Sequence, residues 1–84
     1  MSEEGILEIL ELLSELKDED CVPRNVRIRL ENACIALQCQ ERPTSMNVDA
    51  SLQELDEASE NSNVSAYTKT QIYSIVSKLE CIKQ

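Results

Sequence analysis

Histidine, tryptophan and phenylalanine do not occur in this sequence of 84 residues, and Tyr67 and Tyr73 are its only aromatic residues. The absence of histidine removes the commonest general base of enzymes and a frequent metal ligand. The carboxylates that remain lie mainly opposite the apolar positions, where water solvates them. We therefore expect a protein that is not an enzyme and has no catalytic residues, with catalysis by carboxylates alone as a further alternative.

Residues that interrupt regular structure are also scarce, because the sequence has one glycine and two prolines. The hydrophobic share of 42% is too high for a disordered chain. A core with so few aromatic residues must consist of aliphatic side chains, which favours helices. A chain of this length buries only roughly 60% of its unfolded surface, which does not support two cores. We expect one folded helical domain over residues 1–84.

Positive charge is in short supply, with 8 lysines and arginines against 16 aspartates and glutamates and a formal net charge of −8. A field of this sign repels nucleic acids and anionic lipid surfaces. No apolar run approaches the roughly 20 residues that a membrane span needs. Acidic residues also interrupt the N-terminal apolar stretch, unlike in an export signal. We expect a cytoplasmic protein with no nucleic-acid or membrane partner.

The four cysteines do not form a metal-binding pattern. Cys21, Cys34, Cys39 and Cys81 include no CxxC pair, and no histidine accompanies them. We therefore expect no zinc site and no other cofactor. In a reducing cytosol these residues remain thiols. Cys34 falls on an apolar helix face, whereas Cys21 lies in an expected loop and is the best candidate for an exposed thiol.

Apolar residues recur at helical spacing in four segments of the sequence. Ser2 is the expected cap of the first helix, Pro23 is expected at the first position of the second, and Thr44 or Ser45 is expected to cap the third. The second helix must end before Pro43, which disfavours helical geometry in the preceding residue. The expected bounds are about residues 2–17, 23–40, 44 or 45 to the polar cluster at 60–63, and 65–82.

Each segment carries its apolar residues on one face, and these faces are expected to form the core. In the first helix the face is widened by Leu7 and Leu12. The expected core positions are Ile6, Ile9, Leu10, Leu13, Leu16, Val26, Leu30, Ala33, Cys34, Leu37, Val48, Leu52, Leu55, Ala58, Thr68, Ile72, Ile75, Val76 and Leu79.

The two halves of the chain resemble each other at a spacing of 42 residues. At this spacing the apolar positions of the halves coincide without a gap, and so do the expected loops. A tandem duplication of a helix hairpin, residues 1–42 and 43–84, explains this pattern, because neither copy buries its apolar face alone. We predict an all-α fold, an antiparallel four-helix bundle built from two tandem helix hairpins. The second helix also has a loose likeness to a HEAT-type repeat, but two copies favour a compact bundle. The identical pairs are Leu10 and Leu52, Leu13 and Leu55, Glu15 and Glu57, Val22 and Val64, Leu37 and Leu79, and Cys39 and Cys81.

Two segments carry a resemblance to a known family. The segments from Cys21 to Arg27 and from Tyr67 to Glu80 are similar to those of uncharacterised protein family 0147, a group of small archaeal proteins. The resemblance covers nearly the whole chain. It implies a four-helix bundle, and it implies no activity.

The densest positive charge is the cluster Arg24, Arg27 and Arg29, at the start of the second helix. The helix dipole disfavours cations there, so acidic groups are expected nearby. One interpretation is pairing with carboxylates of the first helix or of residues 18–20, or simple solvation. The alternative is a patch that binds an anion or an acidic partner.

Four apolar residues, Ile28, Ile35, Tyr73 and Ile82, lie off the main apolar faces. A monomeric bundle has limited means to cover all of them, so they are candidates for an interface. The alternative is a broad core with the usual scatter of exposed apolar side chains.

These features favour a non-catalytic protein–protein interaction module or a small subunit of a larger assembly, with another protein or a second copy as partner. A homodimer is one form of this hypothesis. A small-ligand or anion-binding regulatory protein is the alternative, with a carboxylate-based enzyme after it.

Overall fold

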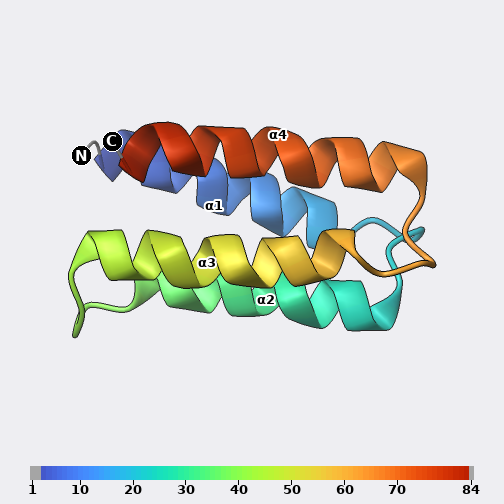
Figure 1. The fold of residues 1–84 in the computed structure, drawn as a ribbon, viewed down its shortest axis with the longest axis horizontal. Helices are drawn as coiled ribbons and strands as arrows, with labels where there is room; N and C mark the ends of the chain where they lie inside the picture. The colour runs from blue at the N-terminus through green and yellow to red at the C-terminus, as the bar shows by residue number, and fades with distance from the viewer. Residues whose placement is uncertain (1–2, 84) are drawn as a thin grey trace.

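The computed structural model describes residues 3–83, which form four antiparallel α-helices joined by short loops (Figure 1). The first and last helices begin and end at the same end of the molecule, beside the loop between the second and third helices. The other two loops lie together at the opposite end. The helices are α1 (Glu3–Lys17), α2 (Arg24–Gln38), α3 (Thr44–Ser59) and α4 (Ala66–Lys83).

The helices form a closed ring in which each one packs against its two neighbours. The backbone of α1 lies against those of α2 and α4, and the backbone of α3 lies against the same two helices, whereas the described backbones of the diagonal pairs stay apart. In Figure 1, α1 and α4 form one layer over α2 and α3. The prediction of an all-α four-helix bundle is confirmed, and the closed ring distinguishes it from an open HEAT-like pair.

The core between the helices is aliphatic, as the near absence of aromatic residues predicts. Most of the expected positions are buried, while Leu10, Leu12, Cys34, Leu52 and Val76 are half-buried at its edge. Leu7 was expected to widen the core but is largely exposed, because it lies on the outer side of α1. The buried apolar residues are Ile9, Leu13, Leu16, Val22, Val26, Leu30, Ala33, Leu37, Val48, Leu55, Ala58, Val64, Ile72, Ile75 and Leu79.

The expected boundaries of the second and third helices differ from the observed ones by one or two residues. Pro23 precedes α2 with an extended backbone rather than occupying its first turn. α2 ends at Gln38, and the expected cap Thr44 is already helical, with no side-chain hydrogen bond capping α3. At α4 the expected start is close, because Ser65 Oγ accepts a hydrogen bond from the backbone N–H of Thr68 at 3.1 Å. The expected cap Ser2 lies outside the described residues.

The loops at one end of the bundle are built by the same backbone hydrogen bonds, 42 residues apart. The N–H of Glu19 donates to Leu16 O, and that of Asn61 donates to Ala58 O. The N–H groups of Val22 and Arg27 bond to Glu19 O and Pro23 O, and those of Val64 and Lys69 bond to Asn61 O and Ser65 O. This recurrence supports the interpretation of a duplicated hairpin.

The two seams between the hairpins differ, because equivalent positions hold side chains of different size. α2 and α3 meet at Ala33 and Ser51, and the Ser51 hydroxyl donates to Ala33 O at 2.8 Å. The residues 42 positions away are Ile75 and Ile9, both buried between α4 and α1. Small residues let two helix backbones approach closely, which accounts for the most extensive helix contact, between α2 and α3.

Polar side chains add further bonds across the α2–α3 seam. Asn47, which is buried, donates from Nδ2 to Cys39 O at 2.6 Å and so satisfies a carbonyl at the end of α2. Asn32 donates from Nδ2 to Glu54 Oε1 at 3.2 Å. The α2–α3 pair is therefore the most strongly cross-linked part of the described bundle.

Candidate functional site

The three arginines expected to form a positive patch have separate roles. Arg27 Nε donates to Lys17 O at 2.7 Å, and its Nη2 donates to Glu19 O and Val22 O at 3.2 and 3.3 Å. It therefore binds the carbonyl of the last residue of α1 and two carbonyls of the loop that leads into α2. Arg24 is exposed and makes no ion pair with a described residue.

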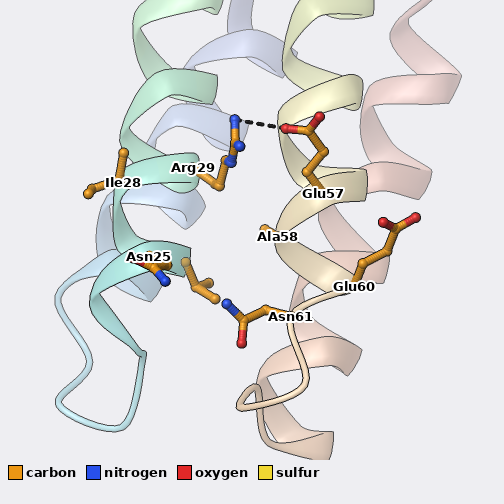
Figure 2. A pocket seen from close by; sticks show the side chains of 8 residues that line it. Asn25, Ile28, Arg29, Glu57, Ala58, Glu60 and Asn61 are labelled. Atoms are coloured by element: carbon orange, nitrogen blue, oxygen red, sulfur yellow. Dashed lines mark ion pairs between the residues drawn. The ribbon is translucent and has the colours of Figure 1, made fainter.

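Arg29 pairs with α3 rather than with the expected carboxylates of α1. Its Nη1 lies 3.0 Å from Glu54 Oε2 and 2.7 Å from Glu57 Oε2. Arg29, Glu57 and Ile28 line a depression of about 560 Å³ between α2 and α3. In Figure 2, Arg29 points toward Glu57 and Ile28 points away from α3. The expectation of acidic partners on the antiparallel neighbour α1 is therefore wrong for this residue.

The candidate interface residues divide between different surfaces. Ile28 and Ile35 are 48% and 60% exposed on α2, and Tyr73 is 54% exposed on α4. Ile82 is half-buried and packs against the core. The structure places the two isoleucines on the helix diagonal to Tyr73, so these residues do not form one continuous surface. Other large exposed apolar residues are Leu7, Met46 and Tyr67.

Tyr73 stands at a groove of about 350 Å³ between α3 and α4, which we name the Tyr73 groove. Leu52 from α3 and Val76 from α4 are half-buried and give the groove an apolar floor. Tyr73 is the only aromatic residue in its lining. The lining residues are Leu52, Gln53, Asp56, Ser59, Tyr73, Val76 and Glu80.

Two carboxylates give the Tyr73 groove a negative charge. Asp56 and Glu80 are exposed, and neither makes an ion pair with a described residue. Among the side chains that the structure describes, no lysine or arginine lines the groove. The Ser59 hydroxyl donates a hydrogen bond to the backbone carbonyl of Asp56 at 2.8 Å, and not to the Asp56 carboxylate. An apolar floor with unneutralised carboxylates on its rim suits an amphipathic cation.

The cysteines are four free thiols. Cys21 is exposed in its loop as expected, and Cys81 is exposed as well. Burial raises the pKa of the Cys34 thiol, and Glu31 raises it further, while Lys17 opposes both effects. Within residues 3–83, no three side chains of the metal-binding types lie close enough together to hold a metal ion.

Sequence reasoning singled out Tyr73 but missed the rest of its groove. Val76 and Glu80 follow Tyr73 by three and seven residues, so all three share one side of α4. Asp56 and Leu52 share a side of α3 in the same way. These spacings are visible in the sequence, but the groove also depends on which sides of α3 and α4 face each other.

The sequence profile of the uncharacterised protein family (UPF0147) matches residues 1–82. The chain belongs to UPF0147. A UPF0147 protein of Pyrococcus furiosus is 37% identical over 82 residues, which cover 96% of this chain and 88% of that protein. One of Methanocaldococcus jannaschii is 36% identical over 72 residues, with 86% of this chain and 77% of that protein covered.

A solved structure agrees with the fold of this UPF0147 chain. A crystal structure of a protein of unknown function superposes with a TM-score of 0.94 at 36% sequence identity. The match covers 100% of this chain and 96% of the other. The family is uncharacterised and these matches name no activity. Among the described residues, no helix has the length and apolar character of a membrane span.

Proposed function

We propose that this UPF0147 protein is a non-catalytic interaction module that binds another protein through the Tyr73 groove. The observation that carries the proposal is the combination in the groove of a half-exposed tyrosine, an apolar floor and two unpaired carboxylates. Tyrosine is enriched at protein interfaces, where its ring fills an apolar contact and its hydroxyl stays hydrated. A bundle that needed Tyr73 only for packing would bury more of it.

The negative charge of the chain favours a different protein as the partner over a second copy of the same chain. The net charge of −8 opposes self-association. Two Tyr73 grooves facing each other across a twofold axis would also bring the carboxylates of Asp56 and Glu80 from both copies together. A partner with a basic surface instead gains from the same charges, mainly in its association rate and specificity.

The other functions considered have less support. An anion-binding patch needs several free arginines. Arg27 holds the loop after α1 and Arg29 is paired with two glutamates, which leaves only Arg24 of the three. An enzyme needs a nucleophile, an acid–base pair or a metal, and the absence of histidine removes the commonest general base. The carboxylates of the Tyr73 groove are better suited to binding than to proton transfer, because they are exposed.

Affinity capture from extracts of the native cell tests the proposal. Wild-type protein, Tyr73→Ser and Tyr67→Ser serve as baits, and quantitative mass spectrometry compares the captured proteins. Tyr67 is a matched control, because it lies on the same helix, is 57% exposed and does not line the groove. We expect at least one protein to be retained by wild type and Tyr67→Ser and lost with Tyr73→Ser. Identical capture by all three baits would refute the proposal.

A further inference from the structure

We infer that the Tyr73 groove receives one lysine or arginine side chain of the partner protein. This inference rests on the proposed function and adds the chemistry of recognition. The groove takes the aliphatic stem of the side chain along its floor, and the cationic head lies at the tyrosine ring beside the acidic rim.

The floor of the groove suits the stem of a basic residue. Leu52 and Val76 are both half-buried, so part of each side chain remains open to contact. Lysine and arginine carry three or four methylene groups before the charge, and these groups pack against apolar surfaces while the head stays at the polar rim. An acidic or purely apolar side chain lacks one of these two parts.

The rim of the groove suits the charged head. The face of a tyrosine ring attracts a cation by about 0.5–1 kcal/mol at an exposed site. Tyr73 and Asp56 come from different helices, so a cation at the ring also lies in the field of a carboxylate from across the groove. Glu80, two turns further along α4, adds negative charge at the other end.

No lysine or arginine whose side chain the structure describes fills this role. Lys78, on the same helix, is directed to α1, where its Nζ lies 3.2 Å from Glu8 Oε1. Arg29 is held in the α2–α3 seam by Glu54 and Glu57. The carboxylates of Asp56 and Glu80 therefore remain uncompensated among the described residues, and an incoming cation does not have to displace an internal one.

Titration with side-chain fragments, followed by ¹H–¹⁵N correlation NMR, tests the inference on the intact chain. The probes are n-butylammonium and n-propylguanidinium, which represent lysine and arginine side chains. The controls are 1-butanol, which has the stem without the charge, and pentanoate, which carries the opposite charge, with ionic strength matched by sodium chloride. We expect saturable shifts at residues 52–56 and 73–80 with one or both cations, and much weaker shifts with the controls.

Variants decide whether the shifts come from the proposed contacts. The double substitution Asp56→Asn with Glu80→Gln is expected to weaken cation binding about fivefold, and Tyr73→Leu is expected to weaken it about threefold. Tyr67→Leu should leave the affinity unchanged. All of these side chains are exposed, and circular dichroism verifies that each variant folds. Equal shifts with 1-butanol, equal shifts at the acidic loop 18–20, or unchanged affinity in the double variant would each overturn the inference.

A failure of the fragment titration can be distinguished from a failure of the proposed function. The fragments report on the chemistry of the groove without any partner, whereas affinity capture reports on the partner without regard to charge. Loss of capture with Tyr73→Ser combined with no specific cation binding would retain the interaction module and reject a basic side chain as its ligand.

Discussion

Two arginine side chains on α2 that are close in sequence make very different contacts. Arg27 makes three hydrogen bonds to carbonyl groups of the α1–α2 connection, while Arg24, three residues earlier, is exposed and makes no ion pair with a described residue. The sequence placed both in one positive cluster. It gave no sign of this difference, because Arg27 binds backbone carbonyls rather than carboxylates, and any residue provides a carbonyl.

Arg27→Ala is expected to lower the free energy of unfolding by about 2 kcal/mol, because hydrogen bonds from a charged group to partly buried acceptors are lost. Arg24→Ala, the matched control, should change it by less than about 0.5 kcal/mol. Urea denaturation followed by circular dichroism measures both values. Equal effects of the two substitutions would contradict the assigned role of Arg27.

The Cys34 thiol is expected to lower the stability of the folded protein at alkaline pH. Burial raises its pKa in the folded protein above the ordinary value of 9.0. As the pH rises through 9.0, the unfolded state therefore releases the thiol proton first, and the folded state loses stability. Below this range, both states keep the proton and the effect vanishes.

Cys34→Ala should therefore reduce the loss of stability between pH 7 and pH 10. Urea midpoints at the two pH values measure this loss for wild type, Cys34→Ala and the control Cys81→Ala, whose thiol is exposed. Cys81→Ala is expected to behave as wild type. A Cys34→Ala protein whose urea midpoint falls between pH 7 and pH 10 as much as that of wild type would contradict this role of Cys34.

At the scale of the helices, the two seams between the hairpins differ in side-chain size. Helical spacing alone predicted where α1 to α4 begin and end. Most of the described boundaries lie within two residues of the predicted ones. The same prediction did not place Ser51 in the core, although Ser51 falls in the series Val48, Ser51, Leu55 and Ala58 at helical steps. The expected core face of this helix ran through Leu52 instead, and only the close approach of α2 reveals the acceptor for the Ser51 hydroxyl.

Replacing Ser51 by the residue at its equivalent position should disrupt the α2–α3 seam. Ser51→Ile overpacks the contact with Ala33 and removes a hydrogen bond, so we expect a loss of about 3 kcal/mol in the free energy of unfolding. Ser77→Ile, the same change at an exposed position of α4, is the control and should cost less than about 0.5 kcal/mol. Urea denaturation of both variants gives the comparison, and a Ser51→Ile protein as stable as the control would contradict a tightly packed seam.

At the scale of the whole molecule, the sequence predicted the fold better than the site. Four apolar faces at helical spacing have one economical solution, a bundle with all faces inward. The Tyr73 groove, in contrast, depends on how α3 and α4 rotate against each other. The amino-acid composition did predict the negative charge of the molecule. This charge favours a partner with a basic surface.

The net charge predicts how the isolated chain behaves. We expect it to remain monomeric, because the charge of −8 opposes self-association through the carboxylate-rimmed groove. Size-exclusion chromatography with light scattering should give a mass near 9.5 kDa at low and moderate salt. A dimer at low salt that Tyr73→Ser dissociates would instead assign the groove to a second copy.

The central claim is that Tyr73 contacts a protein partner. Its most direct test is the dissociation constant of the captured partner, measured by calorimetry for wild type, Tyr73→Ser and Tyr67→Ser. Loss of a tyrosine at the centre of an interface weakens binding by about tenfold or more, so we expect that change for Tyr73→Ser and an unchanged constant for Tyr67→Ser. Equal dissociation constants for the two variants would contradict the claim.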